Sequence, residues 1–83
     1  MDIKVLGPGC PNCQRLEKIA REALVEMGVE ATLSKVTDIK KIVAYDIVST
    51  PALVIDEKVV SSGRVPTKAE VTSMIATALS KVE

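Results

Sequence analysis

Residues 7–13, with the sequence Gly7-Pro8-Gly9-Cys10-Pro11-Asn12-Cys13, contain both cysteines of the 83-residue chain. The segment Ile3–Leu6 predicts a short β-strand before them, and the glycines and proline that follow predict a turn. Pro11 suits the first position of a helix, where its missing N–H costs nothing, so Cys10 is the expected N-cap. Two thiols at this spacing can close a disulfide across one helical turn or share a soft metal ion, and these surroundings favour the disulfide.

The two cysteines have different expected roles. A sulfur at an N-cap faces the unpaired amides of Asn12 and Cys13 and the positive end of the helix dipole, and both stabilise a thiolate. Such positions lower a cysteine pKa from about 8.5 to between about 3.5 and 7.5, so we expect Cys10 to be the attacking sulfur. Cys13, one turn into the helix, is expected to be sheltered and to resolve a mixed disulfide. The alternative is two ordinary buried cysteines that happen to lie close together.

The composition limits the classes to which the protein can belong. Eighty-three residues, of which 47% are hydrophobic, predict one domain over residues 1–83. Eleven basic and eleven acidic residues leave a formal charge of zero, and Tyr45 is the only aromatic residue, so we expect no nucleic-acid partner. No apolar run is long enough for a membrane span, and Met1–Lys4 does not begin a signal peptide. We therefore expect a cytoplasmic protein without a membrane partner.

Metal and cofactor chemistry is restricted by the residue types present. The chain has no histidine, which excludes histidine-assisted nucleophiles and mixed Cys/His zinc sites. Two cysteines alone cannot complete a four-ligand structural zinc site. In a reducing compartment, a close cysteine pair is more often redox-active or metal-binding than a permanent staple. We expect a monomer with no resident metal and no cofactor beyond the redox-active disulfide Cys10–Cys13.

Hydrophobic periodicity and capping signals predict the next elements. A helix follows Cys10 and ends at Gly28, and the alternation over residues 29–34 predicts a strand. Thr37 is expected to cap a second helix, with Asp38 in its first turn. The apolar stripe expected for that short helix consists of Ile39, Ile42 and Val43.

The second half of the chain predicts a hairpin and a final helix. Ala52–Ile55 has the pattern of a buried strand with Pro51 at its entrance, and a tight turn leads to a strand over residues 59–61. Thr67 and Glu70 form a capping box that opens the last helix. The expected buried face of this helix consists of Val71, Met74, Ile75, Ala78, Leu79 and Val82.

The predicted order is β-α-β-α-β-β-α, which defines an α/β fold. A right-handed crossover through the first helix makes the first two strands parallel, and the hairpin adds two strands on the other side of the first strand. The result is a four-stranded mixed sheet with three helices. The cysteine motif then lies at the carboxyl end of a central strand, the usual place for chemistry on open α/β sheets.

Three segments of the chain carry a family resemblance: Gly9–Cys13, Ser49–Ile55 and Val60–Arg64. With them, essentially the whole chain resembles a thioredoxin-like fold, and specifically the small glutaredoxin-like thioredoxins and redox-active disulfide proteins of archaea and bacteria. The resemblance implies an electron carrier in which Cys10 and Cys13 alternate between dithiol and disulfide.

The resemblance also implies which residues bind substrate. In that family the proline matching Pro51 follows a cis peptide bond and packs beside the cysteine pair, so the Thr50–Pro51 bond is expected to be cis. The alternative is a trans proline at a strand end, since only about 5–6% of X–Pro bonds in folded proteins are cis. Thr50 is expected to offer backbone hydrogen bonds to a substrate segment, beside Pro11 and Asn12 of the motif.

The chain departs from family patterns at positions that set the electron donor. Thioredoxins usually have tryptophan where this chain has Gly9, and glutaredoxins commonly have tyrosine where Asn12 stands. Glutaredoxins hold glutathione with two glycines and a nearby acid, whereas here Gly63 is followed by the base Arg64. We therefore expect a thioredoxin-reductase-like donor in preference to glutathione. The first strand lacks the buried acid that shuttles protons in thioredoxins, which leaves water or Lys4 for that role.

Three functions from different classes are compatible with the sequence. The leading hypothesis is a thiol–disulfide oxidoreductase that reduces protein disulfides. The second is a carrier of Cu(I), because copper carriers also place a Cys-X-X-Cys pair between a first strand and a first helix. Their usual order is β-α-β-β-α-β, however, and this chain ends on the amphipathic stretch Val71–Val82. The third is a non-catalytic binding domain, against which the intact cysteine pair argues.

Overall fold

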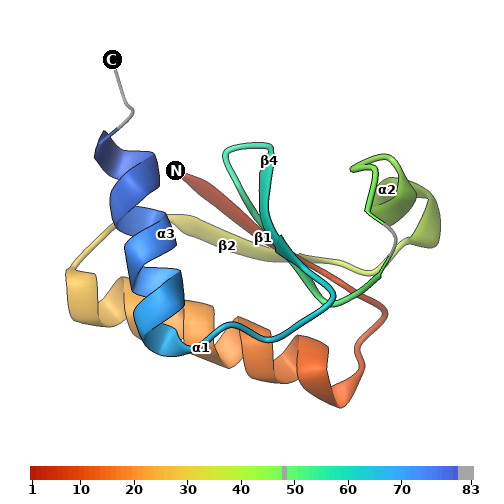
Figure 1. Ribbon diagram of the computed structural model, residues 1–83, viewed down its shortest axis with the longest axis horizontal. Helices are drawn as coiled ribbons and strands as arrows, with labels where there is room; N and C mark the ends of the chain where they lie inside the picture. Colours follow the sequence, from red (N-terminus) through yellow and green to blue (C-terminus); the bar gives the residue numbers. More distant parts are fainter. Residues whose placement is uncertain (48, 81–83) are drawn as a thin grey trace.

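The computed structural model describes residues 1–47 and 49–80. Its elements are β1 (Asp2–Leu6), α1 (Pro11–Met27), β2 (Thr32–Val36), α2 (Ile39–Val43), β3 (Ala52–Ile55), β4 (Lys58–Ser62) and α3 (Lys68–Ser80). The sheet has the order β2-β1-β3-β4, with β2 parallel to β1 and with β3 antiparallel to both β1 and β4 (Figure 1). The predicted thioredoxin-like fold, with its mixed sheet and three helices, is confirmed. Within the described ranges, no helix is long and apolar enough to cross a membrane.

The side chains of β1 alternate between the two faces of the sheet. Ile3 and Val5, each 1% exposed, pack with residues of α1 and α3 in the larger apolar cluster. Leu6 belongs to a second cluster, which includes Ile42 of α2. Accordingly, α1 and α3 cover one face of the sheet and α2 covers part of the other (Figure 1). Burying each such side chain stabilises the fold by about 1.5–3 kcal/mol. The position of β1 is therefore well defined, and with it the start of the cysteine motif that follows.

The structure corrects the prediction for α2 in two respects. The N-cap is Asp38, whose carboxylate accepts a hydrogen bond of 2.9 Å from the amide two residues on, and not Thr37. Of the predicted apolar stripe only Ile42 is buried, whereas Ile39 and Val43 are 62% and 61% exposed. A helix of five residues completes little more than one turn, so only one of its side chains reaches the sheet.

The boundaries of three strands also differ from expectation, since β1 begins at Asp2, β2 ends at Val36 and β4 spans Lys58–Ser62. β2 begins at Thr32, because the residues between α1 and Thr32 form no regular element.

The predicted capping box of α3 is confirmed: the Glu70 amide donates to Thr67 Oγ1, and the Thr67 amide donates to the Glu70 carboxylate, both at 3.1 Å. Leu79 is 41% exposed, since it lies one turn beyond Ile75, the last buried residue of α3. The predicted contact of Val82 lies outside the described residues.

Candidate functional site

The cysteine motif follows the carboxyl end of β1, as the sequence predicts. The Gly7 amide donates a hydrogen bond to the Val36 carbonyl at 2.9 Å, which extends the pairing of β1 with β2 by one residue. Gly9 has a φ of +90°, a conformation open to glycine, and turns the chain into α1. The helix then begins at Pro11. The sheet therefore fixes the backbone on one side of the cysteines, and α1 fixes it on the other.

Cys10 is the N-cap of α1, which confirms the prediction. Its backbone is extended, with φ −68° and ψ 163°, and its Sγ accepts a hydrogen bond from the Cys13 amide at 3.3 Å. Its carbonyl accepts the first helical hydrogen bond, from the Gln14 amide at 3.0 Å. The sulfur of Cys10 is thus held beside the amides at the positive end of the helix.

The pKa values of the two thiols are shifted in opposite directions. The pKa of Cys10 is lowered, first by a hydrogen bond with the Cys13 side chain and then by the Cys13 amide. The pKa of Cys13 is raised, first by burial and then by the hydrogen bond with Cys10. Cys13 is only 4% exposed, whereas Cys10 is partly exposed. Cys10 is therefore the thiol that ionises more readily and that a substrate can reach.

The segment before β3 reaches the same end of the sheet. The Thr50–Pro51 peptide bond is cis, as the resemblance implies. Pro51 is buried, and its carbonyl accepts a hydrogen bond of 2.9 Å from the Gly63 amide, just after β4. A β-carbon placed on Gly7 would lie 3.8 Å from Thr50 Cβ and would collide with Cys13 Sγ. Thr50 and the Cys13 sulfur therefore flank the same point of the backbone.

The residues expected to bind substrate differ in exposure. Pro11 and Asn12 are exposed in the first turn of α1, Thr50 is exposed, and Pro51 is buried behind it. In the part of the chain that the structure describes, neither the N–H nor the C=O of Thr50 has a backbone hydrogen-bond partner. Backbone groups without a partner, at an exposed residue, can pair with an extended peptide.

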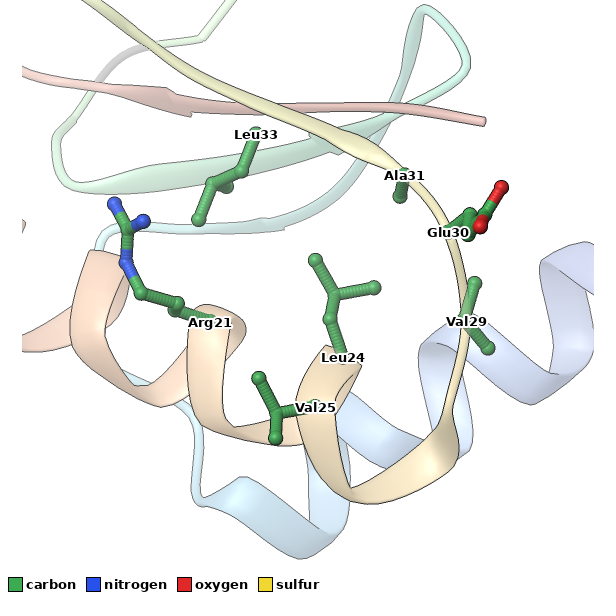
Figure 2. A pocket seen from close by; sticks show the side chains of 7 residues that line it. All are labelled: Arg21, Leu24, Val25, Val29, Glu30, Ala31 and Leu33. Carbon is green, nitrogen blue, oxygen red and sulfur yellow. The ribbon is translucent and has the colours of Figure 1, made fainter.

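A recess of about 390 Å³ lies away from the cysteines, along the second half of α1. Leu24 of α1 and Leu33 of β2 point into it from its two walls, with Arg21 and Glu30 at its ends (Figure 2). Its lining contains no thiol and no pair of carboxylates, and we assign no chemistry to it.

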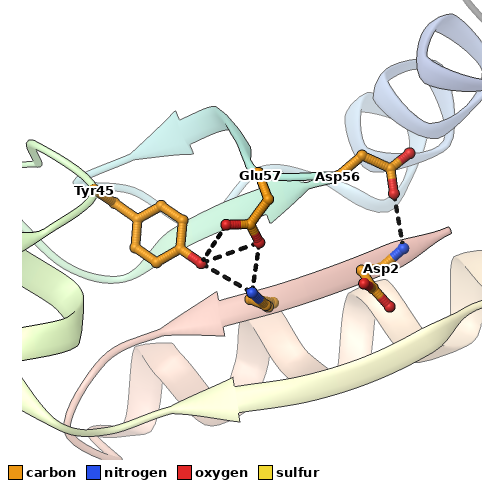
Figure 3. Close-up of polar contacts among 5 residues, drawn as sticks. Asp2, Tyr45, Asp56 and Glu57 are labelled. Carbon is orange, nitrogen blue, oxygen red and sulfur yellow. Dashed lines mark hydrogen bonds and ion pairs between the residues drawn. The ribbon is translucent and has the colours of Figure 1, made fainter.

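Lys4 belongs to a polar network and bonds to neither cysteine. Its Nζ donates to the Tyr45 hydroxyl at 3.0 Å and to the Glu57 carboxylate, and the Tyr45 hydroxyl donates to the same carboxylate at 3.2 Å (Figure 3). These contacts raise the pKa of Lys4, with the Glu57 hydrogen bond as the largest cause. Nζ of Lys4 is therefore engaged by Tyr45 and Glu57, and it makes no hydrogen bond to the Cys13 thiol among the described residues.

The alternative of a metal carrier receives little support from the fold. The observed order β-α-β-α-β-β-α is not the β-α-β-β-α-β order of copper carriers.

The contact between Gly7 and Cys13 is a feature of the site that the sequence does not single out. Glycines in a turn segment are expected for their conformational freedom, and Gly9 and Gly63 have the positive φ that this explanation requires. Gly7 does not have a positive φ, and its role depends on how α1 is placed against β1. The sequence pattern places Gly7 in the turn before the motif, and nothing in it indicates which side chain packs against that glycine.

The chain is similar in sequence to known proteins over most of its length. Residues 1–76, which include the cysteine motif and the Thr50–Pro51 bond, match a family model described as a thioredoxin domain. A thioredoxin of Methanothermobacter thermautotrophicus is 37% identical over 76 residues, which cover 92% of this chain and 99% of that protein. A thioredoxin of Methanocaldococcus jannaschii is 33% identical over 69 residues, which cover 83% of this chain and 79% of that protein.

Proposed function

Since this chain belongs to the thioredoxin family of thiol–disulfide oxidoreductases, we propose that it reduces protein disulfides through Cys10 and Cys13. The observation that carries this proposal is the hydrogen bond of 3.3 Å from the Cys13 amide to Cys10 Sγ. It holds the Cys10 sulfur at the start of α1, where a thiolate is stabilised. The opposite pKa shifts of the two thiols then favour separate roles for them.

In the proposed reaction, the Cys10 thiolate attacks one sulfur of a substrate disulfide. The Cys10–substrate S–S bond forms as the substrate S–S bond breaks, and the departing substrate sulfur takes a proton from water. Cys13 then loses its proton to water and its thiolate attacks Cys10 Sγ. The Cys10–Cys13 bond forms as the Cys10–substrate S–S bond breaks, and the second substrate sulfur takes a proton from water and leaves as a thiol. Two electrons have passed from the protein dithiol to the substrate, with no other cofactor and no metal.

The substrate segment is proposed to bind in extended form beside Thr50. The N–H and C=O of Thr50 would pair with the backbone on one side of the substrate cysteine, as in strand addition. Pro51, buried below Thr50, would support that backbone, while the exposed Pro11 and Asn12 would contact the substrate on the other side of Cys10. All of these contacts suit a protein substrate, which can offer a strand of several residues.

The proposed electron donor is a thioredoxin-reductase-like protein. The Arg64 guanidinium, next to Gly63, donates to the Glu70 carboxylate at 2.7 Å and 3.3 Å, so that position offers no free acid to bind the amine of glutathione. Turnover should be faster with such a reductase and its reduced coenzyme than with glutathione and glutathione reductase at matched reducing equivalents. Equal or faster turnover by the glutathione system would contradict this choice of donor.

We propose that the protein acts in the cytoplasm, because the proposed dithiol must be regenerated after each cycle. The thiol systems of that compartment keep cysteines reduced. We propose one domain over residues 1–83 acting as a monomer, because the site is built from segments of a single chain.

The decisive experiment compares reduction of a protein disulfide by the wild type with reduction by Cys10→Ser. We expect the variant to lose turnover while the wild type cycles between dithiol and disulfide, since the serine hydroxyl is not ionised at neutral pH. Circular dichroism provides the control that both proteins are folded. If Cys10→Ser is folded and retains wild-type turnover, Cys10 is not the nucleophile.

A further inference from the structure

Gly7 is buried, follows the last residue of β1 and lies next to the sulfur of Cys13. A β-carbon on Gly7 would collide with Cys13 Sγ and would come within 3.2 Å of Cys13 Cβ, which is tighter than ordinary van der Waals contact. The space that a side chain would occupy at residue 7 is therefore the space that the resolving sulfur fills.

Backbone conformation does not explain the glycine at this position. Of the four glycines in the chain, Gly9, Gly28 and Gly63 have positive φ, and Gly7 does not. A residue without a positive φ does not need to be glycine, so the obstacle to a side chain at residue 7 is the side chain of Cys13, and chiefly its sulfur. This separates Gly7 from Gly9 and Gly28, where a β-carbon would have no neighbour within 4 Å.

Hydrogen bonds and strand pairing hold the backbone at residue 7 in place. The Gly7 amide is bonded to the Val36 carbonyl at 2.9 Å, and the preceding residue Leu6 is 0% exposed and paired with Ala52 of β3. On the other side, Thr50 Cβ is 3.8 Å from the point where the new β-carbon would stand. Since β1 is fixed by both neighbouring strands, the Cys13 sulfur would have to move.

The position of the Cys13 sulfur matters because Cys10 and Cys13 face each other across the first turn of α1. The Cys10 sulfur accepts a hydrogen bond from the Cys13 amide at 3.3 Å, so residue 13 begins beside the sulfur with which it would form the disulfide. A disulfide requires the two sulfurs to approach to about 2.05 Å in a narrow range of dihedral angles. A sulfur displaced by a side chain at residue 7 would meet that geometry less well.

We propose that Gly7 is a positioning residue for the redox reaction: its missing side chain holds open the space from which Cys13 Sγ closes the disulfide with Cys10. The inference rests on the proposed function, because it concerns the stability of the disulfide that the reaction forms. It assigns to residue 7 a role in setting how readily the protein gives up electrons.

The first test measures the disulfide equilibrium of wild type, Gly7→Ala and Gly28→Ala against dithiothreitol. The Cys10 and Cys13 thiols give two electrons and two protons to oxidised dithiothreitol, whose S–S bond breaks as the Cys10–Cys13 bond forms. We expect Gly7→Ala to lower the equilibrium constant for this disulfide at least tenfold, which is a rise of about 30 mV in reduction potential. Gly28→Ala, strained at a φ of +66° at the far end of α1, should lose stability but keep the wild-type equilibrium constant.

The second test is a double-mutant cycle in thermal stability. Gly7→Ala should lower the unfolding midpoint of the reduced protein, and it should cost much less in a Cys13→Ala background, where the colliding sulfur is gone. This arm also covers the case in which Gly7→Ala alone does not fold, because the double variant is then expected to fold. Equal costs in the two backgrounds, or a wild-type disulfide equilibrium in Gly7→Ala, would overturn the inference.

The two arms distinguish a failure of this inference from a failure of the proposed function. If the wild type formed no reversible disulfide, the proposed function would fail, whereas the stability cycle would still test the Gly7–Cys13 contact because it uses the reduced protein. If the wild type formed the disulfide and Gly7→Ala left it unchanged, only the role of Gly7 would be rejected.

Discussion

The amide of Cys13 donates a hydrogen bond to Cys10 Sγ at 3.3 Å. The pKa of Cys10 is lowered by two groups of Cys13, with the side chain as the largest cause and this amide as the next. In the proposed reaction, one residue therefore both activates the nucleophile and later displaces the product from it. Because the two groups are different parts of Cys13, their contributions can be separated by substitution.

Cys13→Ala should raise the pKa of Cys10 without restoring it fully to the value of an ordinary thiol. The variant loses the Cys13 side chain, which is the largest cause of the lowered pKa, but the amide of residue 13 still donates to the sulfur and the helix dipole is unchanged. The midpoint of the pH dependence of Cys10 alkylation, or of thiolate absorbance, measures the shift. An unchanged midpoint would mean that the thiol of Cys13 does not contribute.

Cys13→Ser should trap protein substrates as mixed disulfides on Cys10. The attacking sulfur is intact, whereas a hydroxyl cannot displace the product, so the covalent intermediate accumulates. Non-reducing gels of the variant mixed with an oxidised protein substrate measure the adduct, and Cys10→Ser is the matched control that should give none. Recovery of no adduct from Cys13→Ser would contradict the division of roles between the two cysteines.

Local signals were sufficient to predict the motif and the order of the elements. The N-cap at Cys10 follows from Pro11 at the next position, and the end of α1 follows from Gly28, whose φ is +66°. The capping box of Thr67 and Glu70 is likewise a pattern within one turn. Such features depend on neighbouring residues only, so the sequence alone determines them.

Contacts between distant residues could not be predicted in this way. Lys4 bonds to Tyr45 and Glu57, which are 41 and 53 positions away, and nothing in the pattern of any one element connects them. The exposure of Val43 also depends on tertiary structure, because it reflects how one short helix is set on the sheet. The collision that a side chain on Gly7 would make with Cys13 belongs to the same class. These contacts are determined by how the helices and strands pack against one another, and knowing which helices and strands form is not enough to predict them.

Ser61→Ala should stabilise the protein by about 1 kcal/mol, because it removes a buried polar group that has no partner. Ser61 is 9% exposed on β4, and within the described ranges its hydroxyl makes no hydrogen bond. In a chain of this size the unfolding midpoint should rise by about 4–8 °C per kcal/mol. The neighbouring Ser62→Ala, at an exposed position, is the control and should change stability by less than about 0.5 kcal/mol. A destabilised Ser61→Ala would show that the hydroxyl is satisfied in solution.

The ion pair that begins α3 should make stability depend on acid pH. Hydrogen bonds from Arg64 and then from the Thr67 amide lower the pKa of Glu70 from its usual 4.5 to about 2. A carboxyl group whose pKa is lower in the folded state stabilises the fold above pH 4.5, and this stabilisation is lost as the pH falls through about 2. The free energy of unfolding of the wild type should therefore exceed that of Glu70→Gln most near neutrality, and the difference should shrink toward pH 2. Unfolding curves between pH 7 and pH 2 measure it.

Glu30→Gln, at an exposed carboxylate with no ion pair among the described residues, is the control and should show a smaller change. A Glu70→Gln difference that stays constant over this range would mean that Arg64 does not hold the carboxylate in solution.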